Sequence, residues 1–176
     1  WEPKKKLIFR RISMKKIAFI IPPTVEILDL AGPVQVFTEA KFYGFEAQLE
    51  FYSYTNEPVS TSGLGFGTVR NYKEAALGSD DFIFIPGMDF DYTKSISFGA
   101  EVDFFRWLKE CSNNKITVCS VCNGAFALGR AGLLKDTECT THWRRIDELK
   151  TQFPEAKVLT DILYIKSNDV YTSAGI

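Results

Sequence analysis

The sequence has little of several features that would point to a specialised class of protein. Its 176 residues include one histidine and four cysteines, and the formal net charge is −1. A free-standing nucleic-acid binder is usually strongly basic, and this chain has no such excess. No apolar run approaches the roughly 20 residues that a membrane-spanning helix needs. Internal repeats and low-complexity tracts are also missing, so we expect one globular domain with a substantial core.

The cysteines are too clustered to form a disulfide framework. All four lie in the second half of the chain: Cys111, Cys119, Cys122 and Cys139. A core of this size does not need disulfides, so we expect reduced thiols and a cytoplasmic protein. Cys119 and Cys122 form a C-x-x-C pair, which in other proteins can be a redox couple, but Cys119 falls inside a predicted strand. A zinc site needs four ligands, and no second paired spacing exists. We therefore expect neither a metal nor a cofactor.

The first residues differ from the rest of the chain. Residues 1–13 carry five basic side chains and no long apolar run. We interpret them as a leader, a tag remnant or an upstream extension, because a signal peptide needs a longer apolar stretch after its basic start. A basic arm that touches nucleic acid is the weaker alternative. The domain itself is expected over residues 14–176.

Apolar strands and helices alternate along the remaining chain. Strands are predicted at 16–22, 48–54, 81–86 and 116–118, and helices at 33–40, 98–111 and 124–131. This alternation predicts a mostly parallel sheet covered on both faces. Further predicted elements are short strands within 58–72, a short helical piece at 73–76, a loop at 88–97, a strand at 138–140, an amphipathic helix at 143–153, and three short strands at 158–159, 163–165 and 170–171.

The stretch from Lys115 to Leu134 is the centre of the predicted fold. A short β-branched run leads into Cys122, and a helix rich in small residues follows. Ser120 and Gly124 stand two residues before and after the cysteine, as a sharp strand-to-helix turn requires. We expect this turn to lift the sulfur above the sheet edge and to favour the thiolate, because free N–H groups lie at a helix N-terminus. The other three cysteines are expected to be structural.

Two further side chains are candidates for the same site. Asp29 lies in an apolar stretch after the first strand, so it either caps the helix expected near Pro33 or is a buried carboxyl that faces the crevice. His142 follows two threonines that suit a helix cap, and it either packs there or orients the sulfur and shuttles a proton. In parallel sheets, ligands bind beyond the carboxyl ends of the strands, where Cys122 and the loop after Pro86 are expected.

These motifs together resemble the ThiJ/PfpI superfamily of class I glutamine amidotransferase-like domains. The resemblance rests on VCSVCNGAFALGRAGLL, TTHW, VYTSAGI, LDLAGPVQVF and FIPG, and it covers residues 14–176. It implies a flavodoxin-like three-layer sandwich with a nucleophile elbow at Cys122, Asp29 as its carboxyl partner and His142 nearby. It also implies backbone oxyanion donors at Asn123 and at the Gly87–Met88 turn, and a homodimer.

Within the superfamily, two branches fit the sequence best. One is the amino-terminal domain of AraC-type transcriptional regulators, which the segment from Thr141 to Ile176 resembles. In that reading the domain senses a small molecule, and DNA is bound only through a downstream segment beyond Ile176. The other is isonitrile hydratase, which implies a cysteine hydratase or hydrolase of small carbon–nitrogen compounds. The peptidase-like branch has His where Asn123 stands, so we expect no protease. A third alternative is a redox sensor in which Cys122 is oxidised to the sulfinate.

Overall fold

The protein is described here by a computed structural model that covers residues 14–175; residues 1–13, interpreted above as a leader or extension, lie outside the described residues. One sheet of seven strands has the order β10-β11-β7-β6-β1-β3-β5. All neighbours pair in parallel except β10 and β11, which form an antiparallel hairpin. The bounds are β1 Lys15–Ile21, β3 Ala47–Ser53, β5 Arg70–Asn71, β6 Phe82–Ile85, β7 Thr117–Val121, β10 Tyr164–Ser167 and β11 Val170–Ser173. The prediction of a mostly parallel sheet is confirmed.

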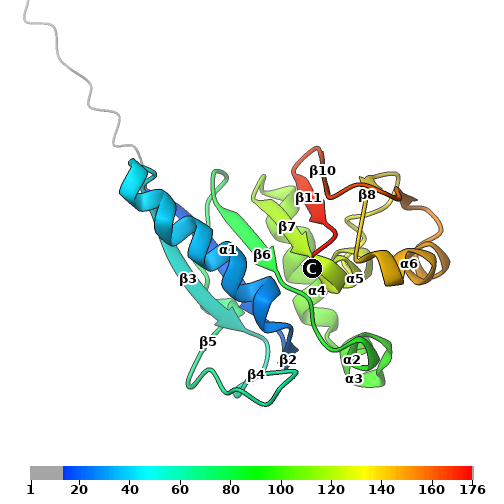
Figure 1. Ribbon diagram of the computed structural model, residues 1–176, viewed down its shortest axis with the longest axis horizontal. Helices are drawn as coiled ribbons and strands as arrows, with labels where there is room; N and C mark the ends of the chain where they lie inside the picture. The colour runs from blue at the N-terminus through cyan, green and yellow to red at the C-terminus, as the bar shows by residue number, and fades with distance from the viewer. Residues whose placement is uncertain (1–13, 176) are drawn as a thin grey trace, which may run out of the picture.

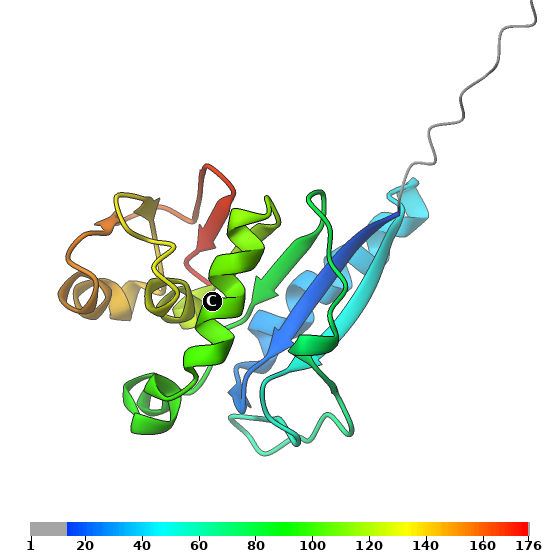
Figure 2. The ribbon, with the colours of Figure 1, turned by 180° about the vertical axis from the view of Figure 1, so that it is seen from behind.

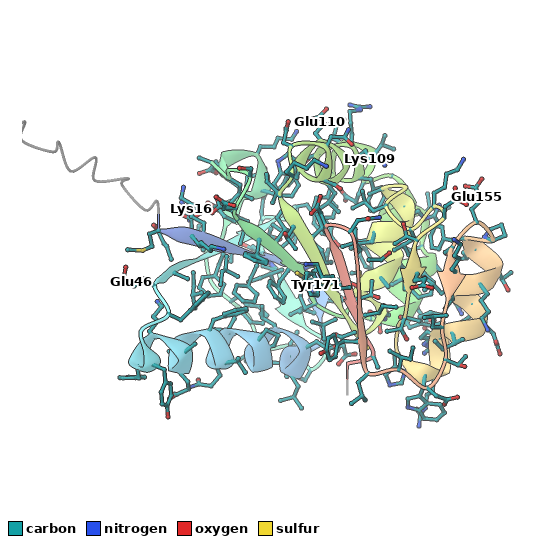
Figure 3. All side chains as sticks on the ribbon, turned by 90° about the horizontal axis from the view of Figure 1, so that it is seen from above. Lys16, Glu46, Lys109, Glu110, Glu155 and Tyr171 are labelled. Carbon is teal, nitrogen blue, oxygen red and sulfur yellow. The ribbon has the colours of Figure 1, made fainter. Side chains whose placement is uncertain are left out.

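Helices cover both faces of this sheet. Helix α1 (Ile27–Ala40) lies on one face, and α4 (Val102–Asn113) and α5 (Ala125–Arg130) lie on the other (Figures 1 and 2). Figure 3 looks along the layers: Lys109 and Glu110 mark the outer side of α4, and Tyr171 lies on β11 in the middle layer. The α/β sandwich expected from the sequence is therefore the fold that forms.

Strand β1 shows why an unbroken apolar run belongs in the middle of such a sheet. Successive side chains of a strand point to opposite faces. Ala18 and Ile20 join the larger core cluster beneath α4 and α5, while Ile17, Phe19 and Ile21 join a second cluster beneath α1. All five are buried. A strand with both faces covered must be apolar at every position, which alternation alone would not provide.

Several short elements complete the chain. Strand β2 (Thr24–Val25) pairs with β4 (Val59–Ser60), and β8 (Glu138–Cys139) pairs with β9 (Lys157–Val158). Helix α6 (Ile146–Gln152) lies beyond α5 (Figure 1). The 3₁₀ turns are η1 Lys41–Tyr43, η2 Tyr72–Glu74, η3 Cys122–Gly124 and η4 Trp143–Arg145. Among residues 14–175, no helix has the length and apolarity that crossing a bilayer requires.

Three sequence predictions about helices were wrong in detail. Helix α1 begins at Ile27, so Pro33 lies inside it and not in its first turn. The segment 88–97 is not a loop, because it contains the short helices α2 (Phe90–Lys94) and α3 (Ile96–Gly99). Each of these is started by a side-chain cap, from Asp89 and Ser95 respectively. The helix expected at 98–111 accordingly begins only at Val102.

Two bulky side chains near the starts of predicted helices are exposed. Val102 is 54% exposed because the buried face of α4 is formed by Phe104, Phe105, Leu108 and Cys111. The helix expected at 143–153 begins only at Ile146, and Trp143 is 69% exposed because it lies in the preceding 3₁₀ turn η4. A period read across a change of helix type assigns the wrong face.

Candidate functional site

Cys122 lies at the turn between β7 and α5, at the carboxyl edge of the sheet. Its φ is 55°, the left-handed region that L-residues other than Gly, Asn and Asp seldom adopt. The turn η3 spans Cys122 to Gly124, and α5 starts at Ala125. Strand β7 therefore passes directly into a helix with the cysteine at the bend, which is the geometry of a nucleophile elbow.

Small residues surround this bend because the neighbouring backbone passes very close. A Cβ added at Gly124 would meet the carbonyl oxygen of Ile85, and one added at Gly175 would meet the Cβ of Cys122. Gly175 also has a φ of 75°. The Oγ1 of Thr141 donates a 2.8 Å hydrogen bond to the carbonyl of Cys122. The bend is thus held on several sides by main chain and by one threonine.

Asp29 is a buried carboxyl next to Cys122. It lies in the first turn of α1 and is 5% exposed. Of the two alternatives left by the sequence, a cap near Pro33 is excluded, because the helix starts before Asp29. The Gly87 backbone N–H and the Cys122 side chain both lie close to its carboxyl and favour its charged form. Asp29 and Cys122 are placed together by the ends of β1 and β7.

Asn123 is bound to the loop after β6. The Met88 N–H donates to Asn123 Oδ1 at 2.8 Å, and Asn123 Nδ2 donates to the Met88 carbonyl at 2.6 Å. Met88 is 1% exposed. Residues with positive φ do not include Met88, so a non-glycine residue is accommodated there without strain. The Met88 N–H, expected as an oxyanion donor, already has a partner within the protein.

The other expected donors are also directed at groups of the site. The Gly87 N–H faces the carboxyl of Asp29, and the Asn123 N–H faces the sulfur of Cys122. A Cβ added at Gly87 would meet a carboxyl oxygen of Asp29 and would lie 3.1 Å from the Cβ of Cys122. Gly87 is therefore the position where only glycine allows these two side chains to approach each other.

His142 lines the same pocket as Cys122. Its Nδ1 accepts a 3.2 Å hydrogen bond from the Arg144 N–H, so the imidazole itself caps the turn η4. The side chains of the two threonines expected to cap have other partners: Thr141 Oγ1 donates to the Cys122 carbonyl at 2.8 Å, and Thr140 Oγ1 donates to the Leu159 carbonyl at 3.2 Å. The positive charge of a protonated His142 would favour ionised Asp29. Within residues 14–175, Nε2 makes no hydrogen bond.

These residues line one pocket of about 410 Å³. Six residues were expected there from the sequence: Asp29, Met88, Cys122, Asn123 and His142 line the pocket, whereas Gly87 lies behind Asp29 and is not a lining residue. Other lining residues were not: Glu26, Ile27, Leu28, Phe90, Arg144 and Arg145. Two of them had a visible signal, since the Arg-Arg pair directly follows the His-Trp motif. Phe90 was missed because its helix was read as a loop.

Electrostatics keep the Cys122–Asp29 pair from carrying two negative charges. Burial raises the pKa of Asp29, and contact with Cys122 offsets part of the rise. Burial also raises the pKa of Cys122 to about 12, and the charge of Asp29 adds to it. The expected thiolate is therefore not the resting form. Helix α5 has only six residues, and its N–H groups do not compensate for desolvation of the sulfur.

The C-x-x-C pair does not form a couple in this structure. Cys119 lines a different, largely aromatic cavity on the α1 side of the sheet, whereas Cys122 faces the pocket described above. All four cysteines are free and buried. Within residues 14–175, no group of three or more His, Cys, Asp or Glu side chains is placed to hold a metal ion.

The fold and this site define a flavodoxin-like domain with a cysteine at a strand-to-helix elbow. The model of the DJ-1/PfpI family matches residues 15–176, and the chain belongs to that family. A crystal structure of an AraC family transcriptional regulator from Pseudomonas putida is similar in fold: the TM-score is 0.74 at 21% identity, over 92% of this chain and 84% of that chain.

Curated relatives give two functional directions. The chain is 30% identical over 141 residues to an uncharacterized protein of Streptomyces lividans, covering 79% of this chain and 95% of that protein. It is 27% identical over 169 residues to isonitrile hydratase of Pseudomonas putida, covering 92% of this chain and 65% of the hydratase. A third match, to the transcriptional regulator GbdR of Pseudomonas aeruginosa, is 36% identical over 56 residues, covering 32% of this chain and 15% of the regulator.

Proposed function

We propose that this domain is the ligand-sensing part of an AraC-type transcriptional regulator, with a small molecule bound in the pocket at Cys122. DNA is then contacted by a downstream segment and not by the domain itself. The match to GbdR and the fold of the AraC regulator from P. putida support this direction. The observation that carries this proposal is that the backbone N–H groups needed for acyl-transfer chemistry already have partners within the protein.

The argument depends on two properties of the site. An enzyme that attacks a carbonyl needs N–H donors aimed at the developing oxyanion. Here the Met88 N–H is bonded to Asn123 at 2.8 Å, and the Gly87 and Asn123 N–H groups face Asp29 and Cys122. A cysteine attacks fastest as the thiolate, but burial raises the pKa of Cys122 to about 12. A neutral thiol and a closed set of donors suit binding better than turnover of amides or esters.

The gene tests this proposal directly. We expect the reading frame to continue past the codon for Ile176 into two helix-turn-helix units. The full-length protein should then bind DNA, and its affinity should change when a pocket ligand is added. A stop codon within a few tens of residues, with no helix-turn-helix, would refute the regulator proposal.

A second candidate is supported by the contact between Asp29 and Cys122. The terminal carbon of an isonitrile can take both a nucleophile and a proton, so its hydration does not begin with an oxyanion. In this reaction the Cys122 thiol would supply sulfur to that carbon and its proton would reach the same carbon through Asp29. Water would then replace the sulfur, giving a formamide and the free thiol. Because the backbone N–H donors already have partners, amide hydrolysis is disfavoured more strongly than isonitrile hydration.

Turnover separates the two candidates. Wild type and Cys122→Ala are incubated with an alkyl isonitrile, and formamide is measured by mass spectrometry. Under the sensing proposal both proteins give the background rate. Formamide production that is lost in Cys122→Ala, and in Asp29→Asn, would establish the hydratase instead.

A further inference from the structure

The side of the sheet that faces α1 is only partly covered by that helix. Within residues 14–175, the apolar cluster beneath α1 takes its strand side chains mainly from β1, β3 and β6, and none from β7, β10 or β11. In Figure 3, α1 runs along the half of the sheet that contains β1 and β3, whereas β11 lies in the other half. On that other half lies the cavity of about 360 Å³ that Cys119 lines, which we call the aromatic cavity.

The register of the strands explains why this cavity forms. Phe84 of β6 stands opposite Cys119 of β7, and Tyr171 of β11 follows in the same row. Residues that stand opposite each other in paired strands share a face of the sheet. The row also contains Phe19, which packs beneath α1, so these side chains point to the α1 side. A small residue between two large rings leaves a hollow with aromatic walls.

The walls of the aromatic cavity are apolar and carry a single charge. Its aromatic residues are Phe37, Phe45, Phe82, Phe84, Tyr164 and Tyr171. Among the described residues, no Asp or Glu lines it, and Lys15 is the only charged residue that does. Tyr164 is 69% exposed and Phe45 is 38% exposed, so part of this aromatic surface still faces water. An apolar molecule that enters the cavity removes that surface from water, which favours binding.

Two lysines at the rim have no acidic partner. Lys15 lines the cavity, and its Nζ lies 5.6 Å from the centroid of the Phe82 ring. Lys166 stands opposite Tyr171 in the β10–β11 ladder, and its Nζ lies 5.4 Å from the centroid of that ring. Within residues 14–175, neither lysine forms a salt bridge. The rim is therefore positively charged.

Lys16 shows by contrast how a lysine of the same strand can be engaged within the protein. Its Nζ donates a 2.7 Å hydrogen bond to the Ala76 carbonyl and lies 4.0 Å from a carboxyl oxygen of Glu50. As the next residue of β1, it points to the opposite face of the sheet from Lys15. The charge of Lys16 is thus partly neutralised, whereas a positive rim without acids complements an anion.

We propose that the aromatic cavity is a second ligand site, which takes a small amphipathic carboxylate. The apolar body of the ligand would lie among the aromatic rings, and its carboxylate would lie at the rim, where Lys15 and Lys166 supply positive charge. A volume of about 360 Å³ falls within the range of small-molecule sites, about 300–1,000 Å³. This site is separate from the Cys122 pocket, because the two share no lining residue.

A second copy of the chain fits this face less well than a small anion does. In a two-fold dimer the same patch of both copies comes together. The positive rims formed by Lys15 and Lys166 would then approach each other, and no acid lines the cavity to offset the repulsion within the described residues. A small carboxylate covers the same apolar surface and neutralises the rim.

Three naphthalenes that differ only in one substituent test the site without knowledge of the natural ligand. 2-Naphthoate is anionic, 2-naphthamide is neutral and 2-naphthylmethylammonium is cationic. Isothermal titration calorimetry on the 176-residue chain gives their Kd values. We expect 2-naphthoate to bind most tightly and the cation most weakly. Lys15→Gln and Lys166→Gln should each weaken 2-naphthoate binding by about two- to fivefold and leave 2-naphthamide binding unchanged.

Control variants place the binding in this cavity. Lys41→Gln, at an exposed position that lines neither cavity, should change no affinity. Cys119→Phe should fill the aromatic cavity and abolish binding of both 2-naphthoate and 2-naphthamide, with folding checked by circular dichroism. The lysine variants decide the question if that variant does not fold. Arg144→Gln should leave 2-naphthoate binding intact; a loss there would place the anion in the Cys122 pocket and overturn the proposal.

Other occupants of this face would be recognised in the same titrations, and each would overturn the proposal. Equal affinity for the three naphthalenes, or unchanged 2-naphthoate binding in both lysine variants, would show that the cavity does not select a carboxylate. Binding that weakens as the protein concentration rises would mean that a second copy covers the face. Binding that is lost in a longer product of the same gene would mean that a downstream segment covers it. None of these results depends on DNA binding or on Cys122, so the sensing proposal stands or falls separately.

Discussion

The side chain of Asn123 holds the backbone of Met88 through both of its polar groups. Its carbonyl oxygen accepts from the Met88 N–H at 2.8 Å, and its amide nitrogen donates to the Met88 carbonyl at 2.6 Å. The residue after the elbow cysteine thereby ties the end of β7 to the loop after β6. The same pair removes the Met88 N–H from the set of donors that a substrate could use.

Replacing this amide should destabilise the domain measurably. In Asn123→Ala the buried N–H and carbonyl of Met88 lose their partners, and we expect the free energy of unfolding to fall by about 1–3 kcal/mol. Urea unfolding followed by circular dichroism measures it. Asn113→Ala, on the exposed side of α4, is the control and should change stability by less than about 0.5 kcal/mol. Equal stability of Asn123→Ala and wild type would mean that the clamp contributes nothing.

A methyl group at Gly87 should separate Asp29 from Cys122. The added Cβ would meet a carboxyl oxygen of Asp29 and lie 3.3 Å from Asn123 Oδ1, so side chains must shift. Overpacking of this kind costs about 1–3 kcal/mol of stability.

The matched control for that change is Gly99→Ala, where the new methyl would have no neighbour within 4 Å. Thermal unfolding of the two variants gives the comparison. If Gly87→Ala unfolds at the same temperature as Gly99→Ala, the close approach at Gly87 is not a constraint on the site.

The sequence revealed the layout of the site better than its chemistry. The elbow at Cys122 and the carboxyl at Asp29 could be placed because strand ends in a parallel sheet share one edge. The protonation of the sulfur could not, since it depends on how deeply a six-residue helix and α1 bury it. Nor could the partner of the Met88 N–H be predicted, because it is a side chain 35 residues away in sequence.

Local patterns also failed where caps or helix type decided the structure. The segment after Met88 has no strong periodicity, yet Asp89 caps α2 with a 2.9 Å bond to the Tyr92 N–H. Phe90 enters the pocket only because of that short helix. In the same way His142, not the threonines before it, caps η4, and Arg144 in that turn lines the pocket.

The buried thiols should make the fold sensitive to alkali. Burial raises the pKa of Cys119 from its ordinary value of 9.0 to about 12, and that of Cys122 likewise. Above pH 9 the unfolded chain loses these protons while the native state keeps them, so stability present below pH 9 is lost as pH rises towards 12. The free energy of unfolding should fall by up to about 1.4 kcal/mol per pH unit for each such thiol.

Comparison with Cys122→Ala isolates one of these groups. The variant should lose stability less steeply with pH, because one titrating thiol has been removed. Urea midpoints at pH 7, 9 and 10.5 provide the slopes. Parallel curves for the two proteins would show that Cys122 ionises at the same pH in both states.

The charge of Asp29 should lower the stability of the domain at neutral pH. Its folded-state pKa is raised, chiefly by burial. Protonation of the native state therefore stabilises it below the ordinary carboxyl value of 3.8, and this contribution is lost as pH rises through the folded-state value. At pH 7 the wild type maintains a charge in a buried position, so Asp29→Asn should be more stable by on the order of 1 kcal/mol. The gain should shrink as pH is lowered towards 4, whereas exposed Asp80→Asn should show no such trend.

Removing the Asp29 charge should also lower the pKa of Cys122 and speed its alkylation at pH 8. A residue whose loss stabilises the fold and activates the thiol serves the pocket and not the packing of the core. If Asp29→Asn is less stable at every pH, Asp29 is instead part of the structural core.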